Sequence, residues 1–251
     1  MKGNLTIDNG NTTVKVAYFI GSKLMATNRF RRDDRAPLER FVSTYHPDSA
    51  IVCSTASEED TAPIEQLIIK RCPQVIRLNH ETPLPISLGY RTPHTLGRDR
   101  IATAVGAWSL TDSSASTLVI DAGTAITYDL VTADGCFEVG NIAPGMTLRF
   151  KALHEHTGRL PLVDPDGDLP IVGYDTDTAI RSGVLLGLIG EIKGYITRLN
   201  DMHPNLTVFM TGGDSQRLLP HLEGMNIIYQ EHLAAIGLNR ILSYNQANGT
   251  I

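Results

Sequence analysis

The sequence reads Leu5-Thr6-Ile7-Asp8-Asn9-Gly10-Asn11-Thr12 near its start, and Thr117-Leu118-Val119-Ile120-Asp121-Ala122-Gly123-Thr124 about half a chain later. In both stretches a short apolar run, typical of a buried strand, leads into a turn that begins with Asp and contains Gly and Thr. Such a turn places a carboxylate, flexible backbone N–H groups and a hydroxyl at one strand end. These groups suit a metal-bound polyphosphate, because the amides meet its oxygens and the carboxylate meets the cation. One copy would be weak evidence, but two copies predict a duplicated fold that holds a nucleotide between its halves.

The bulk composition fits a globular protein of one large or two small domains. Its 251 residues are 42% hydrophobic, which is enough to bury a substantial core. The net charge of -5 gives no general attraction to nucleic acid or to an anionic membrane. Three cysteines, Cys53, Cys72 and Cys136, follow no metal-ligand spacing and favour a reducing compartment. Because no apolar segment resembles a signal peptide or reaches membrane-spanning length, the sequence predicts a soluble, cytoplasmic protein without nucleic-acid or membrane partners.

Strand-like and helix-like segments alternate along both halves of the chain. Strands are expected in two bursts within 4–20, then over 23–30, 50–53, 74–78, 116–121, 126–131, 136–142 and 206–210. Helices are expected over 37–45, 59–71, 146–156, 178–200 and 233–244, with another beginning near Gly97. The Pro-rich segment 81–96 is expected to be an ordered loop. This order predicts an α/β layered architecture, and a polar break near 110–116 places domains at 1–113 and 114–251.

The first turn has two interpretations. Gly10 tolerates backbone angles that other residues resist, so neighbouring N–H groups can converge on an anion. Asn11, Thr12 and Thr13 add short polar side chains, and Lys15 lies within reach of a phosphate. The alternative is a plain β-hairpin, for which Asn-Gly is a common turn. If the first turn is considered alone, the hairpin interpretation is favoured. If it is considered together with the second turn, the phosphate-binding interpretation is favoured. No Gly-x-x-x-x-Gly-Lys-[Ser/Thr] occurs, so this is not a P-loop protein.

The second turn offers ligands for a cation and a phosphate. Asp121 follows a buried strand and can hold a cation directly or through water, and Thr124 can donate to a phosphate oxygen. Asp129 is a weaker candidate, because a solvated strand end is the favoured explanation for it.

A third candidate site lies at Tyr90 and Gly97-Arg98-Asp99-Arg100, where a helix is expected to begin. Helix N-termini attract anions through free N–H groups and the dipole, and the two arginines present forks for a carboxylate or phosphate. Asp99 between them is placed to accept a proton from a hydroxyl. A charged first helical turn with a local ion pair is an equally weighted alternative.

Three further segments are less specific. Glycine-containing bends at 140–145 and 211–213 follow expected strands, and they permit close approach of a flat group such as adenine, or merely a tight turn. Thr176, just before the longest expected helix, is a candidate N-cap. An N-cap hydroxyl that faces a cleft can also bind substrate.

Taken in chain order, these motifs resemble those of type III pantothenate kinases, members of the actin-like superfamily of acetate and sugar kinases. The resemblance runs nearly the full length and rests on 8–15, on Tyr90 with 97–100, on 121–124, and on 173–176 ahead of 179–183. It implies duplicated actin-like (ribonuclease H-like) domains, each a mixed sheet flanked by helices, with a nucleotide cleft between them.

The resemblance also implies ATP-dependent phosphorylation of pantothenate to 4′-phosphopantothenate, the first step of coenzyme A biosynthesis. Asp99 is then the catalytic residue, Asp121 binds a monovalent cation such as K+ or NH4+, and Asp8 is a candidate ligand for Mg2+ or another divalent cation. The implied nucleotide contacts are Asp8, Asn9, Gly10, Asn11, Thr12, Thr13, Val14, Lys15 and Thr124. The implied pantothenate contacts are Tyr90, Gly97, Arg98, Asp99, Arg100 and Thr176. The family works as a homodimer with the substrate pocket at the subunit interface, so Thr176 is expected to serve the partner's site.

One position departs from the family pattern. Val139 stands where the first glycine of a Gly-Gly-x-Ile-x-Pro-Gly segment is expected, which is expected to alter packing around the second turn without removing a catalytic group. Two other functions stay open. Another small-molecule kinase of the superfamily would keep both turns but not the segment 90–100. A non-catalytic nucleotide-binding regulator would not need Asp99 between two arginines.

Overall fold

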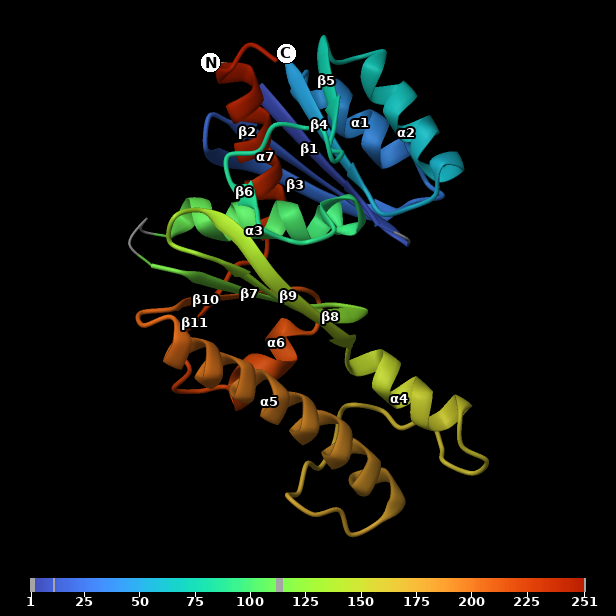
Figure 1. The fold of residues 1–251 in the computed structure, drawn as a ribbon. Coiled ribbons are helices and arrows are strands. Elements are labelled where there is room, and N and C mark those ends of the chain that lie inside the picture. The colour runs from blue at the N-terminus through green and yellow to red at the C-terminus, as the bar shows by residue number, and fades with distance from the viewer. Residues whose placement is uncertain (1–2, 11, 112–114, 251) are drawn as a thin grey trace. The chain divides into compact units, whose positions relative to one another are not determined.

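The structure, a computed structural model, describes residues 3–10, 12–111 and 115–250 (Figure 1). The chain divides into two compact units. The first consists of 1–113, 131–138 and 232–251, and the second of 114–130 and 139–231, so the chain returns twice to the first unit. The predicted domains, 1–113 and 114–251, stay a proposal, because compactness alone does not identify a duplication.

A five-stranded mixed sheet forms the first unit, in the order β3-β2-β1-β4-β5. Its strands are β1 (Gly3–Asn9), β2 (Thr13–Ile20), β3 (Lys23–Arg31), β4 (Ser49–Ser54) and β5 (Gln74–Arg77). The first three strands are antiparallel, whereas β4 and β5 run parallel to β1. All the strands predicted for this part of the chain are confirmed.

Helices cover both faces of this sheet. α1 (Ala36–Tyr45) and α2 (Glu58–Ile69) lie on one face, and α7 (Leu233–Ala247) lies on the other with α3 (Arg98–Leu110) (Figure 1). Ala50 and Val52 of β4 pack into the core under α1 and α2, while Ile51 and Cys53 pack into the core of α3 and α7. Burial on both faces explains why β4 is a continuous apolar run rather than an alternating one.

The second unit contains most of a six-stranded sheet, in the order β11-β10-β7-β8-β9-β6. Its strands are β7 (Thr117–Ala122), β8 (Ala125–Val131), β9 (Cys136–Pro144), β10 (Thr207–Thr211), β11 (Ile227–Tyr229) and the two-residue β6 (Ser87–Leu88). The long helix α5 (Thr176–Met202) and the shorter α4 (Met146–Glu155) join β7, β8 and β10 in one apolar core. The predicted apolar face of α5 is buried there: Ile180, Val184, Leu188, Ile192 and Ile196.

The structure adds short elements that the sequence did not predict. Besides β6 and β11, these are η1 (Pro93–Thr95), α6 (Ser215–Leu218) and η2 (Leu219–His221). The expected solvated strand end at Asp129 is wrong, because Asp129 lies inside β8 with 0% of its surface exposed. Within the described ranges, no helix is both long and apolar enough to cross a bilayer.

Candidate active site

Asp8 lies at the carboxyl end of β1, on the face of the sheet that carries α3 and α7. It pairs with Cys53 of β4 and with Lys15 of β2, and Lys15 Nζ lies 3.9 Å from Asp8 Oδ2. Burial raises the pKa of Asp8, Lys15 lowers it, and the charge of Asp99 raises it further. Burial likewise raises the pKa of the Cys53 thiol, and the charges of Asp8 and Asp99 add to that rise. Cys53, the β4 neighbour of Asp8, packs in the same apolar core as Ile101 of α3, so the helix that carries the predicted base packs against the strand beside the first predicted turn.

The raised pKa of Asp8 leads to a stability prediction. A carboxyl whose pKa is higher in the folded than in the unfolded protein makes folding less favourable once it is ionised. Asp8→Asn, measured by urea unfolding in EDTA, is therefore expected to raise the free energy of unfolding at pH 7. That gain should shrink as the pH falls below the pKa that Asp8 has in the folded protein, because the Asp8 carboxyl of the parent protein is then protonated. An equal or lower stability of the variant at pH 7 would contradict this.

The first turn is a β-hairpin turn whose parts differ in accessibility. The Gly10 N–H donates to the Thr13 carbonyl oxygen over 3.0 Å, so this amide is engaged within the turn. Asn9 and Val14 are fully buried, whereas Thr12 and Lys15 are exposed. Val14 can therefore meet a phosphate only through its backbone. Asn11, which the sequence also placed here, lies outside the described residues.

The first turn of α3 holds the carboxylate of Asp99. Its Oδ1 accepts a hydrogen bond from the Arg100 backbone N–H at 2.9 Å. A Cβ at Gly97 would lie 2.6 Å from that same oxygen, so any other residue there would require the carboxylate to shift from this position. Gly97 is the N-cap of α3, and Arg98, Asp99 and Arg100 form its first turn, so the predicted start of a helix in this segment is confirmed.

Arg100 is buried, with 7% of its surface exposed. Its guanidinium carbon lies 5.8 Å from the ring centroids of both Tyr90 and Phe137. Cations and aromatic faces attract each other at this separation, so the two rings contribute to the position of Arg100. The role of Phe137 beside Arg100 was not predicted from the sequence, because an aromatic residue in a strand has the pattern of an ordinary core residue.

The second turn is closely surrounded by backbone within the second unit. A Cβ at Gly145 would lie 2.6 Å from the Thr124 carbonyl oxygen, which already accepts the Gly145 N–H at 3.0 Å. Gly212 has φ +98°, and a Cβ there would lie 2.5 Å from Asp121 Oδ1. The two glycine-containing bends noted in the sequence therefore both pack against this turn. Thr124 itself is exposed.

Val139, by contrast, is half exposed and lines a groove of about 230 Å³ with Tyr128, Tyr195 and Arg198. Among the described residues, the glycines that pack closely against the second turn are therefore Gly145 and Gly212.

Thr176 is the exposed first residue of α5, and the prediction that it is the N-cap is wrong. Asp175 is the N-cap: its Oδ1 accepts the Thr178 backbone N–H at 2.8 Å, and the Thr178 hydroxyl accepts the Asp175 N–H at 3.1 Å. This reciprocal pair leaves the Thr176 hydroxyl outside the cap. Hydrogen bonds from Thr178 lower the pKa of Asp175.

Comparison with known proteins assigns the chain to a family. A family model described as type III pantothenate kinase matches residues 4–198. The chain belongs to the type III pantothenate kinase family. It is 43% identical over 248 residues to a type III pantothenate kinase of Bacteroides fragilis, covering 99% of this chain and 100% of the relative. It is 42% identical over 243 residues to the type III pantothenate kinase of Phocaeicola vulgatus, covering 96% of this chain and 98% of the relative.

A solved structure supports the fold expected of a type III pantothenate kinase. The chain resembles the activator of the 2-hydroxyisocaproyl-CoA dehydratase from Clostridium difficile with bound ADPNP, with a TM-score of 0.57. The two chains are 11% identical, and the match covers 99% of this chain and 98% of the other. At this identity the likeness shows the fold alone, and it confirms the predicted actin-like architecture.

Proposed function

We propose that this chain transfers the γ-phosphoryl group of ATP to the primary hydroxyl of pantothenate, with Asp99 as the base that takes the hydroxyl proton. The product is 4′-phosphopantothenate, the first intermediate on the way to coenzyme A. One observation carries the proposal. Cys53, which pairs with Asp8, packs in the same apolar core as Ile101 of α3, the helix that begins with Arg98 and Asp99, and the charge of Asp99 raises the pKa of Asp8. A base and a phosphate-binding turn must be neighbours in this way for the hydroxyl to meet the phosphate.

Pantothenate is proposed to lie against the start of α3. Asp99 orients its primary hydroxyl and accepts the proton as the new O–P bond forms and the bond to ADP breaks. Arg98 and Arg100, the N–H groups near Gly97 and the ring of Tyr90 hold its carboxylate or amide. The burial of Arg100 and its position over the ring of Tyr90 support this assignment, because a preorganised group loses less entropy on binding.

ATP is proposed to bind through its phosphates to residues 8–15 and to Thr124. The exposed side chains of Thr12, Lys15 and Thr124 support this assignment, since each can reach a ligand in solution. Phosphoryl transfer depends mainly on positioning and charge neutralisation, so these modest groups suffice.

Cations are proposed at Asp8 and Asp121. At Asp8 a divalent ion fits, because Mg2+ is commonly held by one or two carboxylates together with water and substrate phosphates. The negative charges of Asp8 and Asp99 would both attract it. Among the described residues, no group of three or more His, Cys, Asp or Glu side chains forms a ready-made metal site. When bound, the cations supply positive charge to the phosphate oxygens, while Asp8 and Asp121 hold them in place.

A cytoplasmic homodimer is proposed, with Thr176 contacting pantothenate in the partner's site. The segment before Thr176 supports it: Ile171, Val172 and Tyr174 are 90%, 80% and 68% exposed. Three neighbouring apolar or aromatic side chains in water are typical of a surface that another protein covers.

The test of this function is a coupled ADP-release assay with purified protein, ATP, Mg2+ and K+. Pantothenate is expected to stimulate ADP release, and mass spectrometry should find a product heavier by one phosphoryl group. A panel of sugars and short-chain acids is the control, because stimulation by one of them instead would assign a different kinase activity. ATP binding without turnover on any acceptor would favour a regulator.

Asp121→Ala is expected to remove the response to K+. Losing a group that holds compensating charge near the transferred phosphoryl should lower activity at saturating K+ about tenfold or more. Asp134→Ala, in the exposed turn after β8, is the matched control and should respond to K+ as the parent does. An unchanged K+ titration curve in Asp121→Ala would refute the cation assignment.

A further inference from the structure

Asn9 points to the face of the sheet opposite to Asp8, as neighbouring residues of a strand do. It pairs with Ser54 at the end of β4 and is fully buried. Its Nδ2 lies 3.0 Å from Ser54 Oγ and 3.4 Å from the Oγ1 of Thr61, in the first turn of α2. The Asn9 side chain is therefore hydrogen-bonded to Ser54 and to α2, and it does not face a ligand in solution.

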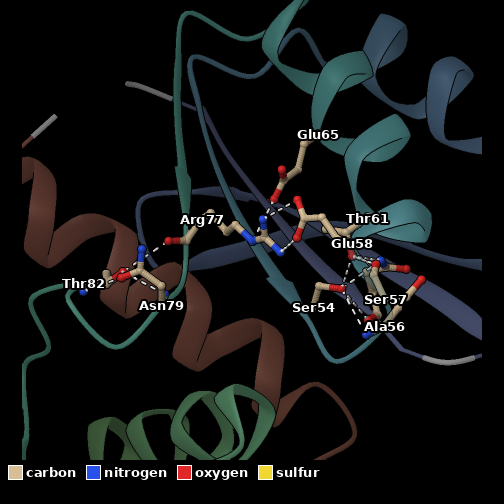
Figure 2. Close-up of polar contacts among 10 residues, drawn as sticks. Ser54, Ala56, Ser57, Glu58, Thr61, Glu65, Arg77, Asn79 and Thr82 are labelled. Carbon is tan, nitrogen blue, oxygen red and sulfur yellow. Dashed lines mark hydrogen bonds and ion pairs between the residues drawn. The ribbon is translucent and has the colours of Figure 1, made fainter. Parts of the chain in front are cut away.

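The hydroxyl groups of this cluster form one connected network. The Thr61 hydroxyl donates to the Ser57 carbonyl oxygen at 2.8 Å and lies 2.7 Å from Ser54 Oγ, a contact in which either hydroxyl can donate. Ser54 Oγ accepts from Asn9 Nδ2 and from the Ala56 N–H at 3.2 Å, and it lies 3.4 Å from the Asn9 carbonyl oxygen, to which it can donate. Figure 2 shows Ser54 with Ala56, Ser57 and Thr61. The chain of donors and acceptors runs from Asn9 through Ser54 and Thr61 to Ser57.

A second connection joins the other end of the hairpin turn to α2. The Arg32 backbone N–H donates to the Thr12 carbonyl oxygen at 3.1 Å, and the Arg32 guanidinium lies 3.1 Å from Asp60 Oδ2. The same carboxylate oxygen accepts the hydroxyl of Ser57, the N-cap of α2, at 2.7 Å. Both ends of the turn are thus tied to one helical turn.

The first turn of α2 is itself held to the sheet. Figure 2 shows Arg77 of β5 reaching Glu58 and Glu65 of α2. Its two terminal nitrogens lie 2.9 and 2.7 Å from the Glu58 carboxylate oxygens, and its Nε lies 3.2 Å from Glu65 Oε1. Such half-exposed pairs add little stability, but a paired, two-point contact restricts the orientation of the helix.

We propose that the first turn of α2, residues 58–61, is a positioning platform for the nucleotide-binding turn, and that Ser54, Thr61 and Arg32 are positioning residues for ATP. The inference rests on the proposed function in taking ATP as the ligand of this turn. Asn9 supplies a further reason: its Oδ1 is buried without a hydrogen-bond partner among the described residues. An amide in that state is retained where its orientation matters, because an unsatisfied buried acceptor costs about 1–3 kcal/mol.

The test compares binding of a non-hydrolysable ATP analogue, by calorimetry, in Thr61→Val and Ser54→Ala with binding in the parent protein. Thr61→Val keeps the shape of the side chain but breaks the chain of donors and acceptors. We expect the dissociation constant for the analogue and the KM for ATP to rise about tenfold, since small displacements of a positioning group have large effects. The KM for pantothenate should stay within about twofold. Thr61→Ser, which keeps the hydroxyl, should restore nucleotide binding.

Ser49→Ala is the matched control. Ser49, like Ser54, is buried and belongs to β4, and its hydroxyl donates to Gln74 Oε1 at 3.0 Å. Ser49→Ala should lower the free energy of unfolding while leaving nucleotide binding unchanged. Unchanged binding in Thr61→Val or Ser54→Ala, despite a similar loss of stability, would overturn the proposal. Should neither variant fold, Arg32→Gln, in the partly exposed second connection, carries the same comparison. Because binding is measured without pantothenate, failure of the kinase assay would count against the proposed function alone.

Discussion

Asp99→Asn is expected to cut the turnover number for pantothenate phosphorylation by about a hundredfold or more, on the usual scale for a lost general base. The amide has the shape of the carboxylate and can still accept a hydrogen bond from the Arg100 N–H, so the start of α3 should stay in place. What it cannot do is take the hydroxyl proton as the O–P bond forms. The KM for ATP is expected to change little, because the proposed phosphate contacts lie on other residues.

Glu39→Gln is the matched control for Asp99→Asn. Glu39 is exposed and lies in the first turn of α1, as Asp99 lies in the first turn of α3, so both changes remove one negative charge from a first helical turn. Glu39→Gln should therefore report any general effect of that charge on a helix. Single-turnover kinetics with both variants measures the chemical step directly. Normal turnover in Asp99→Asn would exclude Asp99 as the base.

The fold was predictable where the local pattern alone determines an element. The apolar face of α5 recurs with helical spacing, and the short apolar runs before the two turns proved to be β1 and β7. Asp129 shows where local pattern fails. A carboxylate amid strand residues looks solvated unless one knows what covers the sheet, and that is decided by segments far away in sequence. The same holds for α7, whose helical character was predicted but whose packing on β1 and α3 was not.

The candidate site was predictable as residue types but not as neighbours. The Asp-initiated turns and the Gly97–Arg100 segment stand out because carboxylates, glycines and arginines have little reason to follow a buried strand or begin a helix together. That Asp8 faces α3 while Asn9 faces α2 follows from strand alternation, but only once the layers on each face are known. Ser54 and Thr61 gave no signal, because single hydroxyl residues are common at strand ends and helix starts.

The contact between α3 and α7 is so close that one added methyl group should strongly lower the free energy of unfolding. A Cβ at Gly237 would overlap the Ala102 carbonyl oxygen and lie 2.7 Å from the Gly106 N, and a Cβ at Gly106 would in turn overlap the Leu233 carbonyl oxygen. These neighbours are backbone atoms of a helix, so they cannot turn aside as a side chain could.

Gly237→Ala is therefore expected to lower the free energy of unfolding by at least about 2–3 kcal/mol, the upper part of the usual range for overpacking. This outweighs the roughly 0.5–1 kcal/mol that alanine gains over glycine inside a helix. Gly190→Ala in α5 is the matched control, since a Cβ there meets nothing within 4 Å, and it should show that gain undiminished. Urea unfolding of both variants measures whether the free energy of unfolding falls in Gly237→Ala and rises in Gly190→Ala. A stabilised Gly237→Ala would mean that α3 and α7 do not meet backbone to backbone, and that the layer supporting Asp99 is built differently.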